Sequence, residues 1–160
     1  TPADWLAEQT GLTVVTGFRD RDAAAGGSGQ LTTAAADALL FRAAEEDRLL
    51  VHLGAVTSAL LIPAGGKLSA VAGFECGPGN RLLDEFAALG TRGKETCDHG
   101  GTRAVQGSAS DELLARWLAH PFLTRKPPKA VPRSAFGPAF AADAFESARS
   151  LGLSLKDLLC

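Results

Sequence analysis

A carboxylate closes an apolar run in this chain and stands directly before a glycine-proline-glycine turn. The run starts at Ala70 and ends on Glu75, and the turn Gly77–Gly79 leads into Asn80. An amphipathic pattern follows, so we expect Glu75 at the end of a strand, facing free backbone N–H groups at a helix start, where phosphate can bind. Glu75 is either part of a ligand site or a solvated strand-end carboxylate, and Asn80 can be the helix cap.

A second group of charges precedes a glycine-rich loop. Arg19, Arg21 and the two aspartates Asp20 and Asp22 lie together in the sequence. They could orient a hydroxylated or anionic substrate through the guanidinium groups, or they could form a mutually neutralising ion-pair network. The loop Gly26–Gly29 could hold a phosphate, or it could be a flexible turn.

Three other patterns do not match the chemistry they suggest. Gly90–Thr96 resembles a phosphate-binding loop, but its glycines are too close together and Glu95 stands where Ser or Thr must contact Mg²⁺. The Cys97–His99 segment, taken with Cys76 and His52, fits no zinc spacing. No Gly-x-Ser-x-Gly motif marks a nucleophilic serine.

Length and charge narrow the class of protein. With 160 residues we expect one domain with a real core, and a net charge of -2 gives no reason to expect nucleic acid or a membrane surface as partner. No apolar run approaches the roughly 18 residues of a membrane span, and no signal peptide is recognisable. The three cysteines have no regular spacing, which favours a reducing, cytoplasmic setting over a disulfide framework. The chain has no methionine, so we expect a fragment or a processed piece.

The elements that would position these groups follow from the pattern of apolar residues. Three closely spaced apolar runs predict antiparallel neighbouring strands, and periodic segments with capping residues predict helices. Strands are predicted at Leu12–Thr16, Leu49–Leu53, Ala59–Ile62 and Leu68–Phe74, and helices at Leu31–Glu46, Asn80–Ala88, Asp111–Leu118, Phe136–Leu151 and Ser154–Leu159, with a weaker one at Pro2–Gln9. The basic, proline-rich stretch 125–133 is either a connection between helices or a segment that binds a partner groove. Three strands followed by a helix are typical of a ribonuclease-H-like α/β unit.

Three segments, in order, resemble the signatures of the anhydro-N-acetylmuramic acid kinase family. The run Val14–Gly29 resembles "DFRxRDxAxGGxGxP", and Gly73–Asn80 resembles "GFDTGPGN". Leu118–Phe122, with Lys126–Lys129 and Arg133, resembles "hPYF…KxxPKSTGRExF". The resemblance covers essentially the whole chain.

The resemblance implies a fold, a reaction and a set of site residues. The fold is that of an actin-like sugar kinase, with residues 1–47 as the end of a first lobe and 48–160 as the start of a second. The reaction uses ATP and Mg²⁺ to open and phosphorylate 1,6-anhydro-N-acetylmuramic acid during cell-wall recycling. It places the general base on Glu75, substrate recognition on Arg21 and Asp22, and phosphate or nucleotide contacts on the set Gly54, Gly77, Gly79 and Asn80. A homodimer is one possible assembly.

The chain also departs from the family pattern. Glu75 stands where the family has Asp, and a carboxylate displaced by about 1 Å can lose roughly a hundredfold in rate. The phosphate loop "NIGGIAN" here reads His52–Ser58, with Ala55 at a glycine position. The flanking phosphate and nucleotide motifs are outside these residues. Two interpretations therefore stay open: the central part of an anhydro-sugar kinase that is inactive alone, or a degenerate kinase-fold protein (a pseudokinase) that binds a sugar, a nucleotide or a protein partner.

Overall fold

A three-stranded antiparallel sheet forms the centre of the molecule. In the computed structural model, which describes residues 2–27, 29, 32–132 and 134–160, the strands are β1 (Arg48–Leu53), β2 (Val56–Ile62) and β3 (Ala72–Pro78), in the order β1-β2-β3. Leu60 of the central strand β2 lies opposite Leu50 of β1 and Gly73 of β3. The predicted antiparallel strands are thus confirmed. The third begins later than predicted, because Leu68–Ala70 forms a single 3-10 turn (η1) first.

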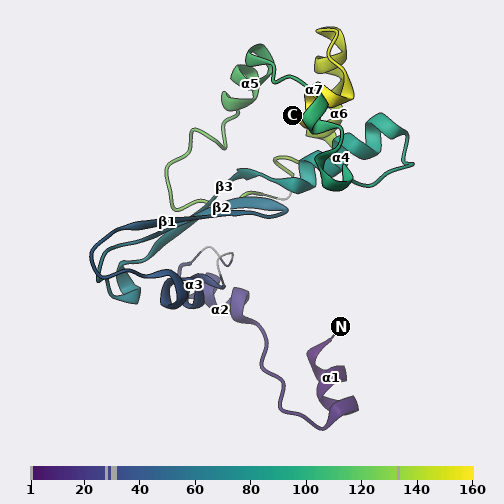
Figure 1. Ribbon diagram of the computed structural model, residues 1–160. Helices are drawn as coiled ribbons and strands as arrows, with labels where there is room; N and C mark the ends of the chain where they lie inside the picture. Colours follow the sequence, from purple (N-terminus) through teal and green to yellow (C-terminus); the bar gives the residue numbers. More distant parts are fainter. Residues whose placement is uncertain (1, 28, 30–31, 133) are drawn as a thin grey trace.

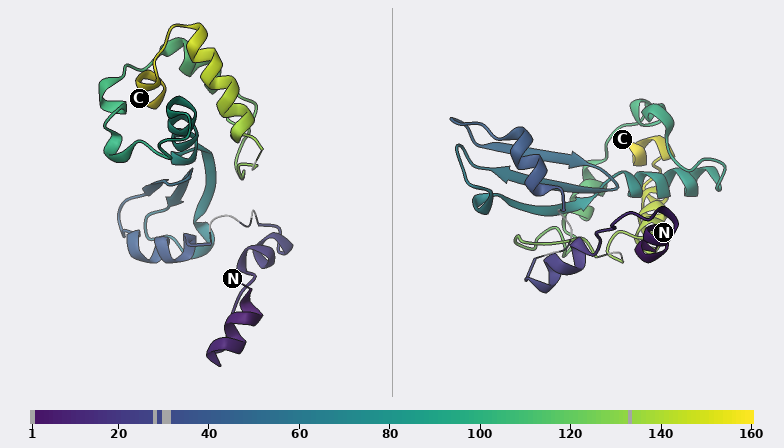
Figure 2. Two further views of the ribbon diagram at one scale, coloured as in Figure 1. Left: turned by 90° about the vertical axis from the view of Figure 1, so that its right-hand side faces the viewer. Right: turned by 90° about the horizontal axis from the view of Figure 1, so that it is seen from below.

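Helices lie on both sides of this sheet (Figure 1). On one side are α2 (Phe18–Ala24) and α3 (Ala34–Phe41). On the other, α4 (Asn80–Thr91), α6 (Pro138–Ser150) and α7 (Leu155–Leu159) gather near the end of β3, with α5 (Asp111–Leu118) and the short turns η2 (His99–Gly101) and η3 (Ala104–Gln106). The first helix, α1 (Ala3–Thr10), extends away from both groups (Figure 2).

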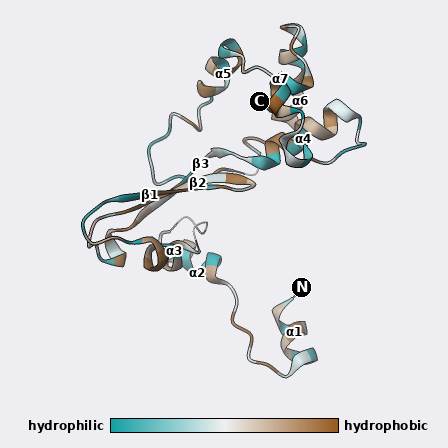
Figure 3. Ribbon diagram, in the orientation of Figure 1, coloured by the Kyte–Doolittle hydropathy of each residue, from teal (hydrophilic) through white to brown (hydrophobic). Residues whose placement is uncertain are grey.

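Two separate cores hold these layers. The larger lies among the helices α4 to α7, where Leu82, Phe86, Leu113, Ala144 and Leu158 are buried together. The smaller joins the sheet to α3 through Ala38, Leu60 and Ile62. On the opposite face of the sheet, three apolar side chains of β1 are exposed: Leu49, Val51 and Leu53. The hydrophobic colour of β1 in Figure 3 therefore does not mean that the whole strand is buried.

Capping explains where the confirmed helices begin. Ser110 accepts a hydrogen bond from the backbone N–H of Leu113 and so starts α5 at the predicted residue. Ser154 and Asp157 form a reciprocal capping box at the start of α7. The proline at the start of α6 is compatible with helix because the first N–H of a helix has no internal partner.

At the N-terminal end two predictions are wrong and one helix was not predicted. Residues 11–17, predicted to contain a strand, have no regular secondary structure, because a strand needs a neighbour and none of the described strands pairs with this segment. The helix predicted at Leu31–Glu46 is only Ala34–Phe41, and its first predicted residue, Leu31, lies outside the described residues. It ends where Arg42 turns extended, ahead of an acidic run that opposes a helix C-terminus. Conversely, the Arg/Asp cluster was not predicted to be helical and forms most of α2.

Candidate active site

Glu75 lies inside β3 rather than at its end. The strand continues to Pro78, and the pairing with β2 shifts here, since Thr57 faces Gly77 whereas Ser58 faces Glu75. Cys76 is therefore the extra residue of a β-bulge directly after Glu75. Bulges redirect side chains and occur often beside active sites, so this one accounts locally for the orientation of the carboxylate.

A distant segment fixes the Glu75 side chain. The backbone N–H of Glu75 donates to the carbonyl of Lys129 at 3.0 Å, and its Oε2 accepts from the backbone N–H of Val131 at 2.5 Å. The described residues donate no hydrogen bond to Oε1. Glu75 is only 9% exposed, so the carboxylate has one fixed oxygen inside the protein and one free of described partners.

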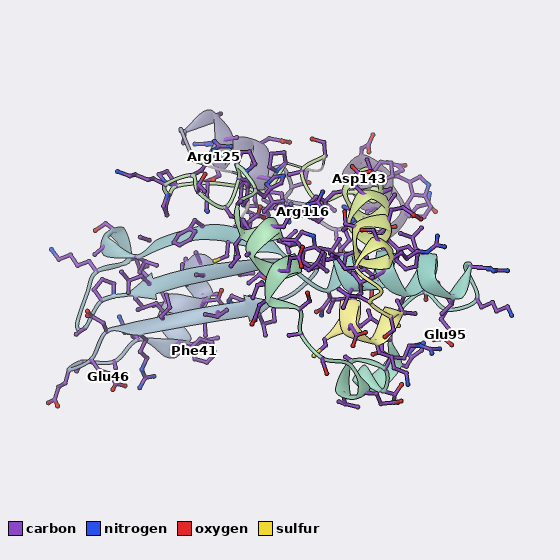
Figure 4. All side chains as sticks on the ribbon, turned by 90° about the horizontal axis from the view of Figure 1, so that it is seen from above. Phe41, Glu46, Glu95, Arg116, Arg125 and Asp143 are labelled. Atoms are coloured by element: carbon purple, nitrogen blue, oxygen red, sulfur yellow. The ribbon has the colours of Figure 1, made fainter. Side chains whose placement is uncertain are left out.

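Lys129 holds this segment in place. Its side chain is buried, and Nζ donates to the carbonyl oxygens of Phe122 and Leu123 at 3.3 and 3.1 Å. The ammonium also lies 4.8 Å from the centre of the Phe122 ring, in a cation–π contact. In Figure 4, Arg125 marks this connection between α5 and α6, which runs beside β3. The basic stretch thus serves as a structural connection that reaches the Glu75 site.

A pocket of about 210 Å³ opens in front of Glu75. Its charged lining residues are Glu75, Arg19 from α2 and Arg81 from the first turn of α4. The apolar wall consists of Ala55, Val56, Pro78, Leu82, Val131, Pro132 and Phe136. A carboxylate and two guanidinium groups therefore border one small cavity, a composition that suits a ligand carrying both hydroxyl and anionic groups.

The predicted substrate residues Arg21 and Asp22 do not line this pocket. Arg21 is exposed on α2. Asp22 borders a different cavity of about 380 Å³, and its Oδ2 accepts from the backbone N–H of Gly29 at 2.8 Å. A Cβ on Gly27 would overlap the Asp22 carboxylate, so this loop folds around the aspartate. The proposed ion-pair network is absent among the described residues, where none of the four charged residues of the cluster forms a salt bridge.

The helix start beside Glu75 does not present free N–H groups, which corrects the prediction. The N–H of Asn80 donates to the Gly54 carbonyl at 2.9 Å, and that of Arg81 donates to the Ala55 carbonyl at 3.3 Å. The β1–β2 hairpin therefore caps α4. A Cβ on Gly79 would overlap the Gly54 oxygen, so the absence of a side chain permits this close approach of two backbones.

The remaining phosphate-side candidates lie around the same turn. Gly77 is buried and pairs with Thr57, and the Asn80 side chain donates to the Leu53 carbonyl at 3.4 Å. Gly79 and Asn80 also line a largely apolar pocket of about 490 Å³, on the side of the helices α4, α5 and α7. The four predicted residues thus meet at one corner, between this pocket and the one that contains Glu75.

The segment after α4 uses its charged groups structurally. Asp98 accepts hydrogen bonds from the backbone N–H groups of Ala104 and Arg103, and these bonds, the one from Ala104 foremost, lower the pKa of its carboxyl group. Glu95 pairs with Arg103, which explains its presence in a loop that only resembles a phosphate site. Across the described residues, no cluster of three or more His, Cys, Asp or Glu side chains could hold a metal ion.

Sequence reasoning missed Arg81 as a site residue. The available signal was a basic residue in the first turn of α4, a turn without acidic residues. A positive charge there opposes the helix dipole and so lacks an obvious structural reason. The involvement of Val131 had no sequence signal, because its partner lies 56 residues away.

Comparison with known proteins decides the family. The family model described as anhydro-N-acetylmuramic acid kinase matches residues 1–160. The chain belongs to the anhydro-N-acetylmuramic acid kinase family. The family kinase of Gloeobacter violaceus is 43% identical over 135 residues, covering 83% of this chain and 35% of that protein. That of Cupriavidus metallidurans is 41% identical, covering 83% and 34%, and that of Caldanaerobacter subterraneus subsp. tengcongensis is 34% identical, covering 96% and 39%.

The resemblance inferred from the three motifs is thus confirmed. The chain spans between about a third and two fifths of the length of these relatives. Among the described residues, no helix is both long enough and apolar enough to cross a membrane. The α/β architecture, with a three-stranded antiparallel sheet and packed helices, is consistent with a sugar kinase domain.

Proposed function

We propose that this chain is the central part of an ATP-dependent anhydro-sugar kinase and that Glu75 is its general base. The observation that carries the proposal is the buried Glu75 carboxylate, held by the Val131 N–H and bordering a pocket with two guanidinium groups. The names of its relatives give the substrate class, an anhydro-N-acetylmuramic acid. On this proposal the fold is the actin-like one, with residues 1–47 ending one lobe and 48–160 starting the next, and the protein acts in the cytoplasm.

The proposed reaction has two coupled bond changes. Glu75 accepts a proton from a water molecule, and the water oxygen attacks the anomeric carbon of the sugar, whose bond to the bridging oxygen breaks. The released oxygen takes the terminal phosphoryl group of ATP, which leaves ADP. Glu75 suits the first change because one oxygen is fixed by Val131, which orients the other without a flexible partner.

The substrate and nucleotide contacts follow from the family signatures and stay proposals. Arg21 is exposed and available to a ligand. Asp22 instead accepts the hydrogen bond from the Gly29 backbone N–H, so it is a residue that orders the glycine-rich loop. Gly54, Gly77, Gly79 and Asn80 meet at the corner where ATP phosphates would have to approach the sugar. The described residues by themselves do not fit Mg²⁺, since they offer no cluster of acidic ligands, and no step is assigned to the ion.

One observation favours a second function, binding of a sugar, nucleotide or protein partner without catalysis. The N–H groups of Asn80 and Arg81 are occupied by the hairpin carbonyls, so the helix start offers less to a phosphate than the family signature suggests. The longer side chain of Glu75 also favours the non-catalytic function, because its carboxylate oxygens are displaced relative to those of an aspartate.

A turnover assay separates the two functions. The complete gene product that contains residues 1–160 is mixed with ATP, Mg²⁺ and 1,6-anhydro-N-acetylmuramic acid, and ADP release and the phosphorylated sugar are measured. The kinase proposal predicts both products in equal amounts and no ADP without the sugar. Binding of the sugar with no phosphorylated product would instead support the non-catalytic function.

A further inference from the structure

Arg81 occupies an unusual place for a basic residue. It stands in the first turn of α4, where the partial positive charge of the helix end disfavours a guanidinium. Asp84 and Glu85 lie three and four residues later on the same helix and could pair with it, yet Arg81 forms no salt bridge with any described residue. The side chain therefore has no stabilising partner in the described chain.

Arg19 approaches the same cavity from a distant part of the sequence. It lies on α2 and, like Arg81, forms no salt bridge among the residues that the structure describes. Both side chains line the pocket of about 210 Å³ that contains Glu75. Two guanidinium groups that have no salt-bridge partner in the described part of the chain, together with one carboxylate, give this small space an excess of positive charge, which an anion would compensate.

We propose that Arg19 and Arg81 form an oxyanion-binding pair at the Glu75 pocket, with Arg81 as a specificity-determining residue. This inference deepens the proposed function and rests on it for the identity of the ligand. The pair takes a carboxylate or phosphate group, which the guanidinium fork can bind through two parallel hydrogen bonds. The source is either the acid group of the sugar or a phosphate of the nucleotide.

The pocket composition explains why the pair does not simply neutralise Glu75. The Oε2 atom of Glu75 is already bonded to the Val131 N–H, and neither arginine is within salt-bridge distance of the carboxylate. The other oxygen of Glu75 therefore has no partner among the described residues, and the two guanidinium groups stay available for the ligand. Binding and proton transfer are thus assigned to different side chains of one pocket.

The test compares Arg81→Gln and Arg81→Lys with Arg92→Gln, which removes the same charge at the C-terminal end of the same helix and lies outside the pocket. Affinities of the complete gene product are measured by calorimetry for 1,6-anhydro-N-acetylmuramic acid, its neutral methyl ester, ADP and inorganic phosphate. We expect Arg81→Gln to weaken binding of one oxyanion ligand by about tenfold to a hundredfold. Arg81→Lys, which keeps the charge but loses the fork, should lie between.

Comparison of the four ligands identifies the source of the anion. Weaker binding of the acid but not of its ester assigns the pair to the sugar, and weaker binding of ADP alone assigns it to the nucleotide. If the wild-type protein binds phosphate in an Arg81-dependent manner but binds neither sugar nor ADP, the anion site stands and the proposed kinase function falls. The inference is overturned if Arg81→Gln alters no affinity more than Arg92→Gln does.

The melting temperature of Arg81→Gln shows whether Arg81 supports the fold instead of binding a ligand. A residue that opposes the helix dipole should leave the melting temperature unchanged or slightly raised when it is neutralised. A clear drop in the melting temperature of Arg81→Gln, with unchanged affinities, would mean that Arg81 supports the fold and would overturn its assignment to a ligand.

Discussion

Replacing Gly79 by alanine tests whether this glycine serves the fold. A Cβ there would overlap the Gly54 carbonyl oxygen, so the hairpin would have to move away from α4. That movement breaks the bond from the Asn80 N–H to Gly54, 2.9 Å long, and the bond from Arg81 to Ala55, 3.3 Å long. At about 0.5–1.5 kcal/mol for each bond, plus strain from overpacking, we expect Gly79→Ala to reduce the free energy of unfolding by about 2–4 kcal/mol.

Urea denaturation followed by circular dichroism measures this change, and Gly54→Ala is the matched control. The nearest atom to a Cβ on Gly54 is the Val56 carbonyl oxygen at 3.5 Å, an ordinary contact. The free energy of unfolding of the control should therefore change by less than about 1 kcal/mol. The reasoning is refuted if Gly79→Ala is as stable as the unmodified chain, or if Gly54→Ala is destabilised equally.

Three further predictions concern stability. Lys129→Met should lower the free energy of unfolding by about 2–4 kcal/mol in urea denaturation, because two backbone carbonyls lose their donor; a loss no greater than that of an exposed lysine variant would contradict this. Gly27→Ala should displace the Asp22 carboxylate, so the Gly29 amide should exchange its hydrogen faster, whereas unchanged exchange would disprove the loop contact. The bond from Ser154, the largest cause, lowers the Asp157 pKa to about 2 from 3.8. This carboxylate therefore stabilises the chain above pH 3.8, and its contribution is lost as the pH falls toward 2, so the melting-temperature advantage over Asp157→Asn should vanish across that window; a constant advantage would refute the link.

Local signals predicted much of the C-terminal two thirds. The apolar runs around Leu50 and Leu60 predicted paired strands, because short connections leave few other arrangements for them. The periodic segments Asp111–Leu118 and Ser154–Leu159 predicted two helices, and the structure caps them with Ser110 and Ser154 through bonds that span three residues. These features depend on neighbours in the sequence and can therefore be inferred from it.

The failures have a common physical cause, the dependence on distant parts of the chain. Val15 and its neighbours have strand-forming side chains, but no described strand pairs with them, and Val15 remains exposed. The partner of the Glu75 carboxylate is a backbone N–H at Val131, whose position depends on the buried Lys129. The free N–H groups expected at Asn80 depended on where the hairpin would lie, which the local pattern does not contain.

The candidate site was therefore predicted in part. The signature motifs predicted Glu75 as a site residue, and in the structure its side chain lines a pocket. The charged residues that share this pocket are Arg19 and Arg81, whereas the motif pointed to Arg21. Spatial proximity across α2, β3 and α4 decides which side chains meet, and sequence order does not give it.

The most direct test of the central claim is the turnover of Glu75→Gln in the complete gene product. The amide oxygen can still accept the hydrogen bond from Val131, so the melting temperature and sugar affinity should stay close to those of the unmodified protein. The amide cannot take a proton from water, so the phosphorylation rate should fall by about 10²–10⁴-fold. A Glu75→Gln protein that phosphorylates the sugar at the unmodified rate would contradict the assignment of Glu75 as the general base.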